Sequence, residues 1–411
     1  MKMAAAAFLV AISIIGFSVA QPVPHPAIPF PQSQLRSGGS LTEQAMLDRD
    51  CLATWEVIRE RLISSENCAS GELRVIVDGY DFGGSERPTY SEGIGWGMLF
   101  AAIMERPGHS TREIFDGLNA YRKRYLRPSG FMDWRILANG KIGDYGIAVE
   151  AEENIAMALL LAHAQWGSEK STYWTEFRKL TDNLMSDCVL PDEKFLKPGD
   201  GWGGKDLLHP ANWKLAYWRI WGKVLGEPRW EEVRKSTAEL MAQITRISPT
   251  GLPPHWCRSD GSPTGSSTPY FAEYTFEYDA LQLPIHNELE LAWFGAAAAP
   301  EAGAMNQKIT AWARFSPHTV PSNTMDGFAL DGKVTGKYVS STFVASFLAA
   351  AFQHDEAYFR ECLSVLRQPR PGSNGYYAAL IRLYSLLVVS GNFPDVSSRV
   401  SPANGVSQLG E

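Results

Sequence analysis

The sequence has fewer basic than acidic residues, and this shortage of positive charge excludes two classes of partner. Its 411 residues carry 38 Lys and Arg against 45 Asp and Glu, a formal net charge of −7 at pH 7. A general nucleic-acid binder, or a protein that docks on anionic membranes, needs a basic face. We therefore expect neither nucleic acid nor a membrane surface as a partner of the mature chain.

Cysteine is scarce, and motifs for metals and nucleotides are missing. The five cysteines are an odd number, so at least one lies outside any intrachain disulfide; Cys51–Cys68 is one of the pairings open to the others. The eight histidines are scattered, with no HExxH and no zinc-type Cys/His spacing. Neither GIGWGM nor Trp202-Gly-Gly-Lys205 has the spacing of a nucleotide-binding loop, and no Gly-x-Ser-x-Gly nucleophile turn occurs. The sequence thus predicts no metal and no cofactor.

Long apolar runs are absent except at the start of the chain. Residues 1–20 combine Lys2, an apolar stretch over 4–16 and the small residues Ser18-Val19-Ala20. This order is typical of a secretory signal peptide cleaved near Ala20. A membrane anchor is the alternative, although a spanning helix needs roughly 20 apolar residues. We expect a protein that is secreted or periplasmic.

The remaining chain reads as one domain between two polar ends. Residues 21–40 are rich in Pro, Gly and Ser and predict a linker or N-terminal arm, and residues 395–411 predict a frayed polar tail. Between them, over 41–394, apolar residues recur with helical spacing and predict twelve helices. Their expected ranges are 42–64, 90–105, 111–126, 151–166, 170–187, 211–226, 229–246, 285–298, 300–315, 340–353, 355–367 and 375–391. A short strand is expected over 72–77.

The predicted helices alternate in character. Those over 90–105, 151–166, 340–353 and 375–391 are apolar on nearly all sides. Those over 111–126, 170–187, 229–246 and 355–367 carry charge on one face. A helix that is apolar all round is buried, whereas an amphipathic one covers a core. This alternation predicts an all-α fold, an (α/α)6 barrel in which six inner helices are ringed by six outer ones.

One acid stands at the start of an otherwise apolar helix, in YSEGIGWGMLFAA. Glu92 follows Ser91, so the simple interpretation is an acid in a first helical turn, where the helix dipole favours an anion. However, Gly93, Gly95 and Gly97 each cost a helix about 1 kcal/mol relative to Ala. They suggest that something large approaches this backbone closely, and Trp96 offers a flat face to it.

Other carboxylates stand at the starts of other apolar helices. Glu150, Glu152 and Glu153 open the helix over 151–166, and Asp279 precedes the helix over 285–298. Such acids are often ordinary first-turn residues. In a barrel, though, parallel inner helices place like ends on one rim. We therefore expect Glu92, Glu150, Asp133 and Asp279 to share that rim with aromatic side chains, an arrangement that suits a carbohydrate.

These motifs make the chain resemble a known family, glycoside hydrolase family 8, whose members are inverting endo-glycanases. The resemblance covers about residues 75–394. SEGIGWGM resembles the family's Ser-Glu-Gly-x-x-Tyr-Gly-Met signature, and EAEENIAMALLLAHAQWGS resembles its acidic helix. FEYDALQLPIHNELELAWFG and GYYAALIRLYSLLVVSGNFP resemble two later segments. The family's fold is an (α/α)6 barrel, the architecture that the helix pattern predicts.

The resemblance implies roles for single residues. Glu92 matches the general acid and Asp279 the general base, while Glu150 falls where the family has an Asp that contacts the sugar. The implied substrate-binding residues are Trp96, Trp134, Asp133, Arg219 and Tyr278. The chain departs from the family pattern at five positions: Glu150 replaces Asp, Asn154 replaces an acid, Gln282 and His286 replace arginines, and Asp133 is an acid where a neutral residue is usual.

The expected activity is hydrolysis of internal β-1,4 bonds in a polysaccharide, with inversion, by a monomer. Glycoside hydrolysis needs one protonated and one ionised carboxyl group. A cellulose-like β-glucan is the first expectation for the substrate, chitosan the second because of the extra acids Asp133, Glu152 and Glu153, and xylan the third. The replaced arginines motivate a different reading, a carbohydrate-binding protein without activity. A polysaccharide lyase is disfavoured because the predicted site is acidic rather than basic.

Overall fold

The computed structural model describes residues 26–32, 41–81, 83–168, 172–265, 275–368, 372–373 and 375–400. These residues form twelve α-helices and short two- or three-residue strands. The helices agree with the twelve expected ranges to within a few residues, so the prediction of an all-α fold is confirmed. The predicted signal peptide, residues 1–20, lies outside the described residues.

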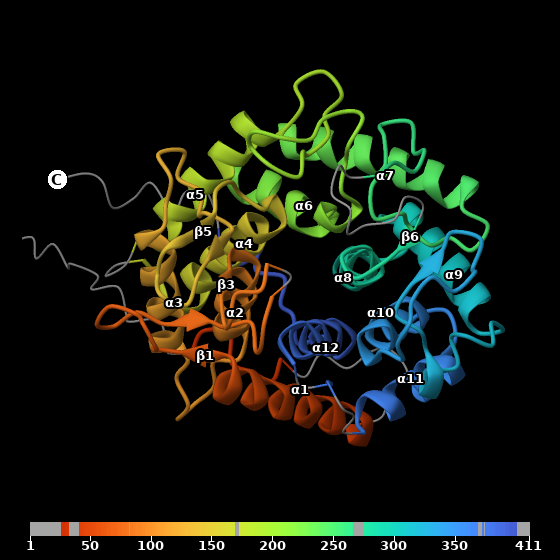
Figure 1. The fold of residues 1–411 in the computed structure, drawn as a ribbon, viewed down its shortest axis with the longest axis horizontal. Coiled ribbons are helices and arrows are strands. Elements are labelled where there is room, and N and C mark those ends of the chain that lie inside the picture. The colour runs from red at the N-terminus through yellow and green to blue at the C-terminus, as the bar shows by residue number, and fades with distance from the viewer. Residues whose placement is uncertain are drawn as a thin grey trace, which may run out of the picture.

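The helices are arranged as two concentric rings (Figure 1). The inner helices are α2 (Ser91–Ile103), α4 (Val149–Trp166), α6 (Leu215–Leu225), α8 (Leu283–Phe294), α10 (Ser341–Ala351) and α12 (Tyr376–Val389). The outer helices are α1 (Leu41–Arg61), α3 (Arg112–Arg124), α5 (Tyr173–Asn183), α7 (Arg229–Ile247), α9 (Pro300–Ala313) and α11 (Glu356–Leu366). Chain order alternates between the rings, and α1 packs on α12 to join the two ends of the chain.

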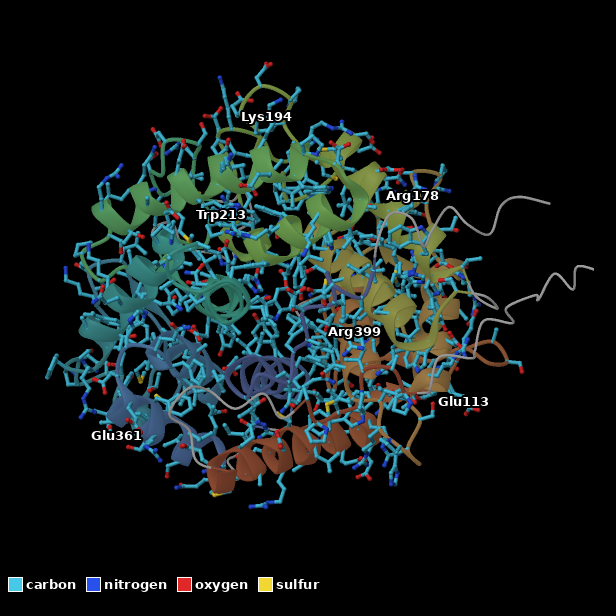
Figure 2. The ribbon with its side chains drawn as sticks, turned by 180° about the vertical axis from the view of Figure 1, so that it is seen from behind. Glu113, Arg178, Lys194, Trp213, Glu361 and Arg399 are labelled. Atoms are coloured by element: carbon cyan, nitrogen blue, oxygen red, sulfur yellow. The ribbon has the colours of Figure 1, made fainter. Side chains whose placement is uncertain are left out.

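Burial follows the predicted alternation. Every residue of α2 except Glu92 is buried, and α4, α10 and α12 are nearly as enclosed. The outer helix α3 buries one face through Phe115, Leu118 and Tyr121 and exposes the other. Figure 2 shows side chains filling the space between the rings, with Glu113, Lys194 and Glu361 on the periphery. The apolar inner helices thus form the core, as their composition requires.

Short strands connect the helices at one end of the barrel. The sheet of β3 (Thr89–Tyr90), β4 (Arg135–Ile136) and β5 (Ile142–Asp144) leads directly into α2, and β4 pairs antiparallel with both neighbours. Two further antiparallel pairs join β1 (Ile63–Ser64) to β2 (Arg74–Val75) and β6 (Thr275–Phe276) to β7 (Phe328–Ala329). The strand expected over 72–77 is β2. These strands hold the starts of inner helices in place.

The polar ends pack more closely than predicted. Within the expected N-terminal arm, Ile28 and Phe30 are buried, and the backbone N–H of Phe30 donates to the carbonyl of Glu105 at 2.7 Å. At the other end, Val396 and Val400 are buried. The prediction of fraying is therefore wrong for residues 395–400, because two apolar side chains dock there. Residues 401–411 lie outside the described part.

All five cysteines are free thiols, so the Cys51–Cys68 pairing does not form. Cys51 is buried against the hydroxyl of Ser390, with Sγ and Oγ 3.6 Å apart. Cys68 instead contacts backbone carbonyls of its own loop, at Ser64 and Glu66. In the part of the chain that the structure describes, no helix is long and apolar enough to cross a bilayer.

Candidate active site

The starts of several inner helices meet at one end of the barrel. Glu92 lies in the first turn of α2, Glu150 in the first turn of α4, and Tyr376 begins α12. Asp279 precedes α8 and Lys214 precedes α6. The charges of Glu92, Glu150 and Asp279 act on one another, and Lys214 acts on both glutamates. The structure thus brings together three of the four carboxylates that the sequence predicts on one rim, Asp133 being the exception.

Glu92 is a partly exposed acid in an enclosed setting. Its Oε2 accepts a hydrogen bond from the hydroxyl of Tyr376 at 3.3 Å, while its Oε1 has no partner within the described residues. Burial raises the pKa of Glu92 well above its ordinary value, and the nearby charges of Glu150 and Asp279 raise it further. Removing a carboxylate from water and placing like charges beside it both favour the protonated form. Glu92 is therefore set up to hold a proton.

Glu150 is buried beside a lysine. Burial raises its pKa; the positive charge of Lys214 opposes this shift, and a hydrogen bond from Gln282 opposes it too. The Lys214 ammonium lies 3.4 Å from the Glu150 carbonyl oxygen and 3.3 Å from Oε2 of Glu153. Lys214 thus brings a positive charge to this centre. The sequence resemblance points instead to Arg219, five residues later and inside α6.

Asp279 faces two histidines that come from distant loops. Its Oδ2 lies 3.6 Å from Nε2 of His209 and 3.4 Å from Nε2 of His255, and its side chain is 33% exposed. Burial opposes ionisation of Asp279, but the two histidines outweigh burial and hold its pKa below the ordinary value. Burial also lowers the pKa of His255 to about 4. Asp279 is consequently an ionised acceptor in the same centre where Glu92 keeps its proton.

Two consecutive tyrosines at the start of α12 line the centre. Besides Tyr376, the hydroxyl of Tyr377 accepts from the amide of Gln282 at 3.2 Å and donates to the carbonyl oxygen of Tyr278. Tyr377 thereby connects α12 to the loop that carries Asp279. Both tyrosines escaped the sequence reasoning, although they stand in the GYYAALIRLYS segment on which the resemblance partly rests.

The three glycines of α2 make room for the protein itself. A Cβ on Gly93 would lie 2.7 Å from the Tyr376 hydroxyl, and one on Gly95 would lie 2.9 Å from the carbonyl oxygen of Ala151. A Cβ on Gly97 would meet the side chains of Val75 and Leu118. The close approach predicted from these glycines is real, but it is the approach of neighbouring elements rather than of a ligand. Gly93 lets Tyr376 reach Glu92.

The aromatic side chains divide into core and rim residues. Trp96 is fully buried and packs on Phe100 and Tyr384, so its predicted role as a sugar platform is wrong. Trp134 is half-buried, and its ring lies 5.5 Å from that of Tyr90, which precedes Glu92 by two residues. Tyr278 is 41% exposed beside Asp279. Trp134 and Tyr278 are therefore the predicted aromatic residues that remain available to a ligand.

A further exposed aromatic was not predicted. Trp202 is 42% exposed and packs edge-on against Trp256, whose ring in turn stacks on His209 with centroids 4.2 Å apart. It therefore continues the aromatic surface outward from the Asp279 side. Its place in a Gly-rich loop, GDGWGGK, is the sequence signal that could have indicated an exposed ring.

Two other predicted binding residues have structural partners. Arg219 donates to Oε1 of Glu290 at 2.8 Å and stacks over Phe294, near the end of α8 remote from Asp279. Asp133 is buried, and its Oδ1 accepts from the backbone N–H of Gly146 at 3.2 Å. Arg219 is thus directed away from the carboxylates, and Asp133 fixes a loop. Neither is a ligand-facing group in this structure.

The positions that depart from the family pattern are buried. The two nitrogens of His286 contact the hydroxyl of Tyr384 at 2.7 Å and the carbonyl oxygen of Ala211 at 3.1 Å. Asn154 is fully enclosed, with both side-chain polar atoms lacking a partner within the described residues. His286 thus joins α8 to α12 through Tyr384. It supplies a neutral contact, since burial holds its pKa well below the ordinary value.

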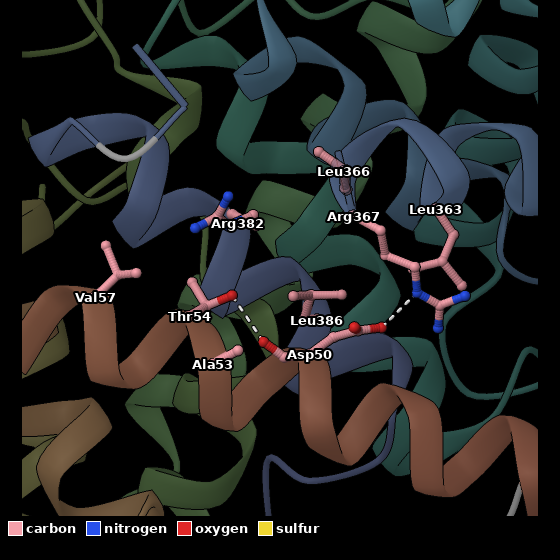
Figure 3. Close-up of a pocket in the computed structure, with 9 residues that line it drawn as sticks. All are labelled: Asp50, Ala53, Thr54, Val57, Leu363, Leu366, Arg367, Arg382 and Leu386. Atoms are coloured by element: carbon pink, nitrogen blue, oxygen red, sulfur yellow. Dashed lines mark hydrogen bonds and ion pairs between the residues drawn. The ribbon is translucent and has the colours of Figure 1, made fainter. Parts of the chain in front are cut away.

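A pocket elsewhere in the molecule is separate from this centre. It lies between α1, α11 and α12, where Arg367 donates to Oδ2 of Asp50 at 2.7 Å (Figure 3). Its other lining residues are Ala53, Thr54, Val57, Leu363, Leu366, Arg382 and Leu386. Because it sits toward the outer ring and contains none of the three clustered carboxylates, it has no part in their chemistry.

A barrel of this architecture with acids clustered at the helix starts defines a class of helical-barrel proteins with a carboxylate centre. The match to known proteins is specific within that class: the family model for "Glycosyl hydrolases family 8" matches residues 32–391. The chain belongs to this family of glycoside hydrolases.

Individual relatives agree with this assignment. The chain is 32% identical to Endoglucanase 2 of Ruminiclostridium josui over 92% of its own length and 80% of that protein. It is 30% identical to Endoglucanase A of Acetivibrio thermocellus, over 85% and 70% of the two lengths. Among solved structures, the β-1,3-1,4-glucanase from Paenibacillus sp. X4 superposes with a TM-score of 0.80 over 90% of this chain and 99% of that one, at 24% identity. The last comparison supports the (α/α)6 barrel fold alone.

Proposed function

We propose that this chain hydrolyses internal β-1,4 bonds of a cellulose-like β-glucan with inversion, using Glu92 as general acid and Asp279 as general base. The observation that carries the proposal is that the pKa values of two carboxyl groups in one centre are shifted in opposite directions. The pKa of Glu92 is raised and that of Asp279 is lowered. Where the environments of two acids push their pKa values apart in this way, one acid is suited to donate a proton and the other to accept one.

The proposed step is a single displacement. Protonated Glu92 donates its proton to the glycosidic oxygen as the bond from that oxygen to the anomeric carbon breaks. Asp279 takes a proton from a water molecule, whose oxygen bonds to the anomeric carbon from the opposite face. Glu92 ends ionised and Asp279 protonated, and exchange with solvent restores both. Proton transfer by a positioned side chain contributes about 10²–10⁴-fold to such a rate.

Glu150 and Lys214 support this division of roles. The negative charge of Glu150 raises the pKa of Glu92, whereas Lys214 limits the accumulation of negative charge. The Oε1 atoms of Glu92 and Glu150 have no hydrogen-bond partner among the described residues and are acceptors that sugar hydroxyls could satisfy. Trp134, Tyr278 and Trp202 offer partly exposed rings on which sugar faces could pack.

The substrate class is inferred from the relatives and from the acids. Two relatives that are 32% and 30% identical are named endoglucanases, which favours a β-glucan. Chitosan is the second candidate from the sequence because extra acids could bind a polycation. Yet Asp133, Glu152 and Glu153 are all buried, so their charges are poorly placed for one. Xylan remains an alternative, because more distant relatives are named xylose-releasing exo-oligoxylanases.

Export belongs to the same proposal. The first 20 residues have the order of a signal peptide, and a polysaccharide substrate is met outside the cytoplasm. We infer that the mature chain acts in the periplasm or outside the cell, as a monomer. Mass spectrometry of the mature N-terminus after expression in a secreting host tests this part, and an uncleaved Met1 on an exported product contradicts it.

Release of reducing ends from a panel of β-glycans tests the activity. Wild type and Asp279→Asn are each assayed on carboxymethylcellulose, mixed-linkage glucan, chitosan and xylan. We expect the largest release from the glucans and its loss by at least about 100-fold in the variant. Binding of cello-oligosaccharides by folded wild type without any release would favour the carbohydrate-binding alternative, which Gln282 and His286 motivate. NMR of the first product distinguishes inversion from retention.

A further inference from the structure

The cluster of His209, His255 and Asp279 has the composition of a transition-metal site. Among the described residues, one ligand atom from each of these three lies within 4.8 Å of the others. Both histidines are buried, and Asp279 is partly open to solvent. Two imidazoles and one carboxylate form the protein ligand set of several zinc sites that keep a position open. Sequence spacing could not indicate this cluster, because the two histidines lie in separate loops.

The separations suit an ion better than hydrogen bonds. The two His–Asp contacts, at 3.4 Å and 3.6 Å, exceed the 2.7–3.2 Å of ordinary N–H···O bonds. Ligands bound at about 2.0–2.1 Å around a tetrahedral zinc ion lie roughly 3.3 Å apart, by geometry from the usual bond lengths. The two His–Asp edges of the cluster are close to that value, and all three ligand atoms lie within 4.8 Å of one another.

The orientation of His209 adds an independent observation. This side chain is 7% exposed, and its Nε2, directed at Asp279, has no hydrogen-bond partner within the described residues. Its other nitrogen, Nδ1, lies 3.2 Å from Oδ1 of Asn212, and Trp256 stacks on the ring. Metal-binding histidines commonly donate their second ring N–H to such an acceptor, which fixes the ring and its tautomer.

We propose that His209, His255 and Asp279 bind one divalent transition-metal ion of the zinc type, and that the bound ion suppresses hydrolysis by occupying the general base. A ligand set with two imidazoles disfavours Mg²⁺ and Ca²⁺, which prefer oxygen ligands. An ion on Oδ2 draws charge from the carboxylate and weakens it as a proton acceptor. The metal-binding part stands alone, whereas the inhibitory part rests on the proposed function.

Direct titration tests binding without reference to activity. The full mature chain is treated with chelator and then titrated with Co²⁺, whose visible absorption is intense in four-coordinate sites, and with Zn²⁺ by calorimetry. We expect one ion per chain. His209→Gln and His255→Gln should each weaken binding by at least about tenfold. His318→Gln, which changes an exposed histidine of the outer surface, should leave it unchanged. Thermal unfolding establishes that each variant is folded.

The outcomes separate the two parts of the proposal. If wild type binds neither ion up to millimolar concentration, or if His318→Gln weakens binding as much as the other two, the site is refuted. In a hydrolysis assay, Zn²⁺ should abolish release of reducing ends, and chelator should restore it. Binding with unchanged turnover would refute the inhibitory part. Binding by a chain that shows no hydrolysis even after chelation would refute the proposed function and leave the metal site standing.

Discussion

The hydroxyl of Tyr376 donates a hydrogen bond to Oε2 of Glu92 across 3.3 Å, although 284 residues separate them along the chain. This contact joins the first and the last inner helix of the described barrel at the acid that is proposed to donate the catalytic proton. It is possible because Gly93 has no side chain, which leaves space for the tyrosine ring. Several consequences of this arrangement can be measured.

Replacing Tyr376 with Phe should move the alkaline side of the pH–activity profile to higher pH. The Tyr376 hydrogen bond stabilises the ionised form of Glu92 and therefore lowers its pKa against the larger effect of burial. A general acid works while it is protonated, so activity falls as pH rises through that pKa. Without the hydroxyl the pKa rises further. The measurement is kcat/KM against pH for Tyr376→Phe and for the exposed control Tyr80→Phe, and a shift toward lower pH would contradict the assignment.

Glu92→Gln should leave the fold intact and remove most of the activity. The side chain keeps its shape and loses its proton, so we expect kcat to fall by about 10²–10⁴-fold. Thermal unfolding should be nearly unchanged, because Glu92 is partly exposed and has one hydrogen bond. The matched control is Glu113→Gln on the outer face of α3, which should retain full turnover. Near-normal turnover of Glu92→Gln would remove this residue from the mechanism.

The space around two helical glycines predicts opposite effects of Gly→Ala changes. Gly95 lies at the close contact of α2 and α4, whereas Gly303 has room for a side chain. In Gly95→Ala the new Cβ would lie 2.9 Å from the carbonyl oxygen of Ala151 and 3.0 Å from Cβ of Asn154. Atoms so near the backbone cannot move aside, so we expect a loss of roughly 1–3 kcal/mol in the free energy of unfolding. In Gly303→Ala, in the outer helix α9, the nearest atom is at 3.6 Å. That variant should gain up to about 1 kcal/mol from helix propensity. Denaturant unfolding of both variants provides the comparison.

Glu152 should make stability depend on pH between mildly acidic and neutral conditions. Burial raises its pKa in the folded state from 4.5 to about 7. Stability from the protonated form is fully present below pH 4.5 and is lost as pH rises toward 7, a change on the order of 3 kcal/mol. Glu152→Gln can still accept the Met132 N–H through its amide oxygen and does not ionise. The difference in unfolding free energy between variant and wild type should therefore grow from pH 5 to pH 8. A constant difference would show that Glu152 does not titrate in this range.

The barrel could be predicted because its helices differ in a property that composition records. Helices that are apolar all round, such as α2 and α10, must lie inside, and charged ones such as α7 must lie outside. The same logic brought Glu92, Glu150 and Asp279 to one end. It also should have excluded Trp96 as a sugar platform, since a tryptophan in the middle of such a helix has no side that faces solvent.

The residues that were missed share a different physical reason. His209 and His255 lie in loops, and nothing in their spacing shows that both reach Asp279. Lys214 was overlooked because the family resemblance pointed to Arg219, whose long side chain turns toward Glu290. Contacts between distant loops depend on where the barrel carries their ends. Local periodicity contains no information about that.

The bond between Tyr376 and Glu92 also has a consequence for the order of synthesis. A ribosome makes Glu92 early and Tyr376 near the end, so this hydrogen bond can form only after almost the entire polypeptide has been synthesised. A nascent chain that stops short of α12 therefore lacks the hydrogen bond that lowers the pKa of Glu92. The contact that tunes the pKa of Glu92 would thus form last, at about the moment when α12 closes the barrel.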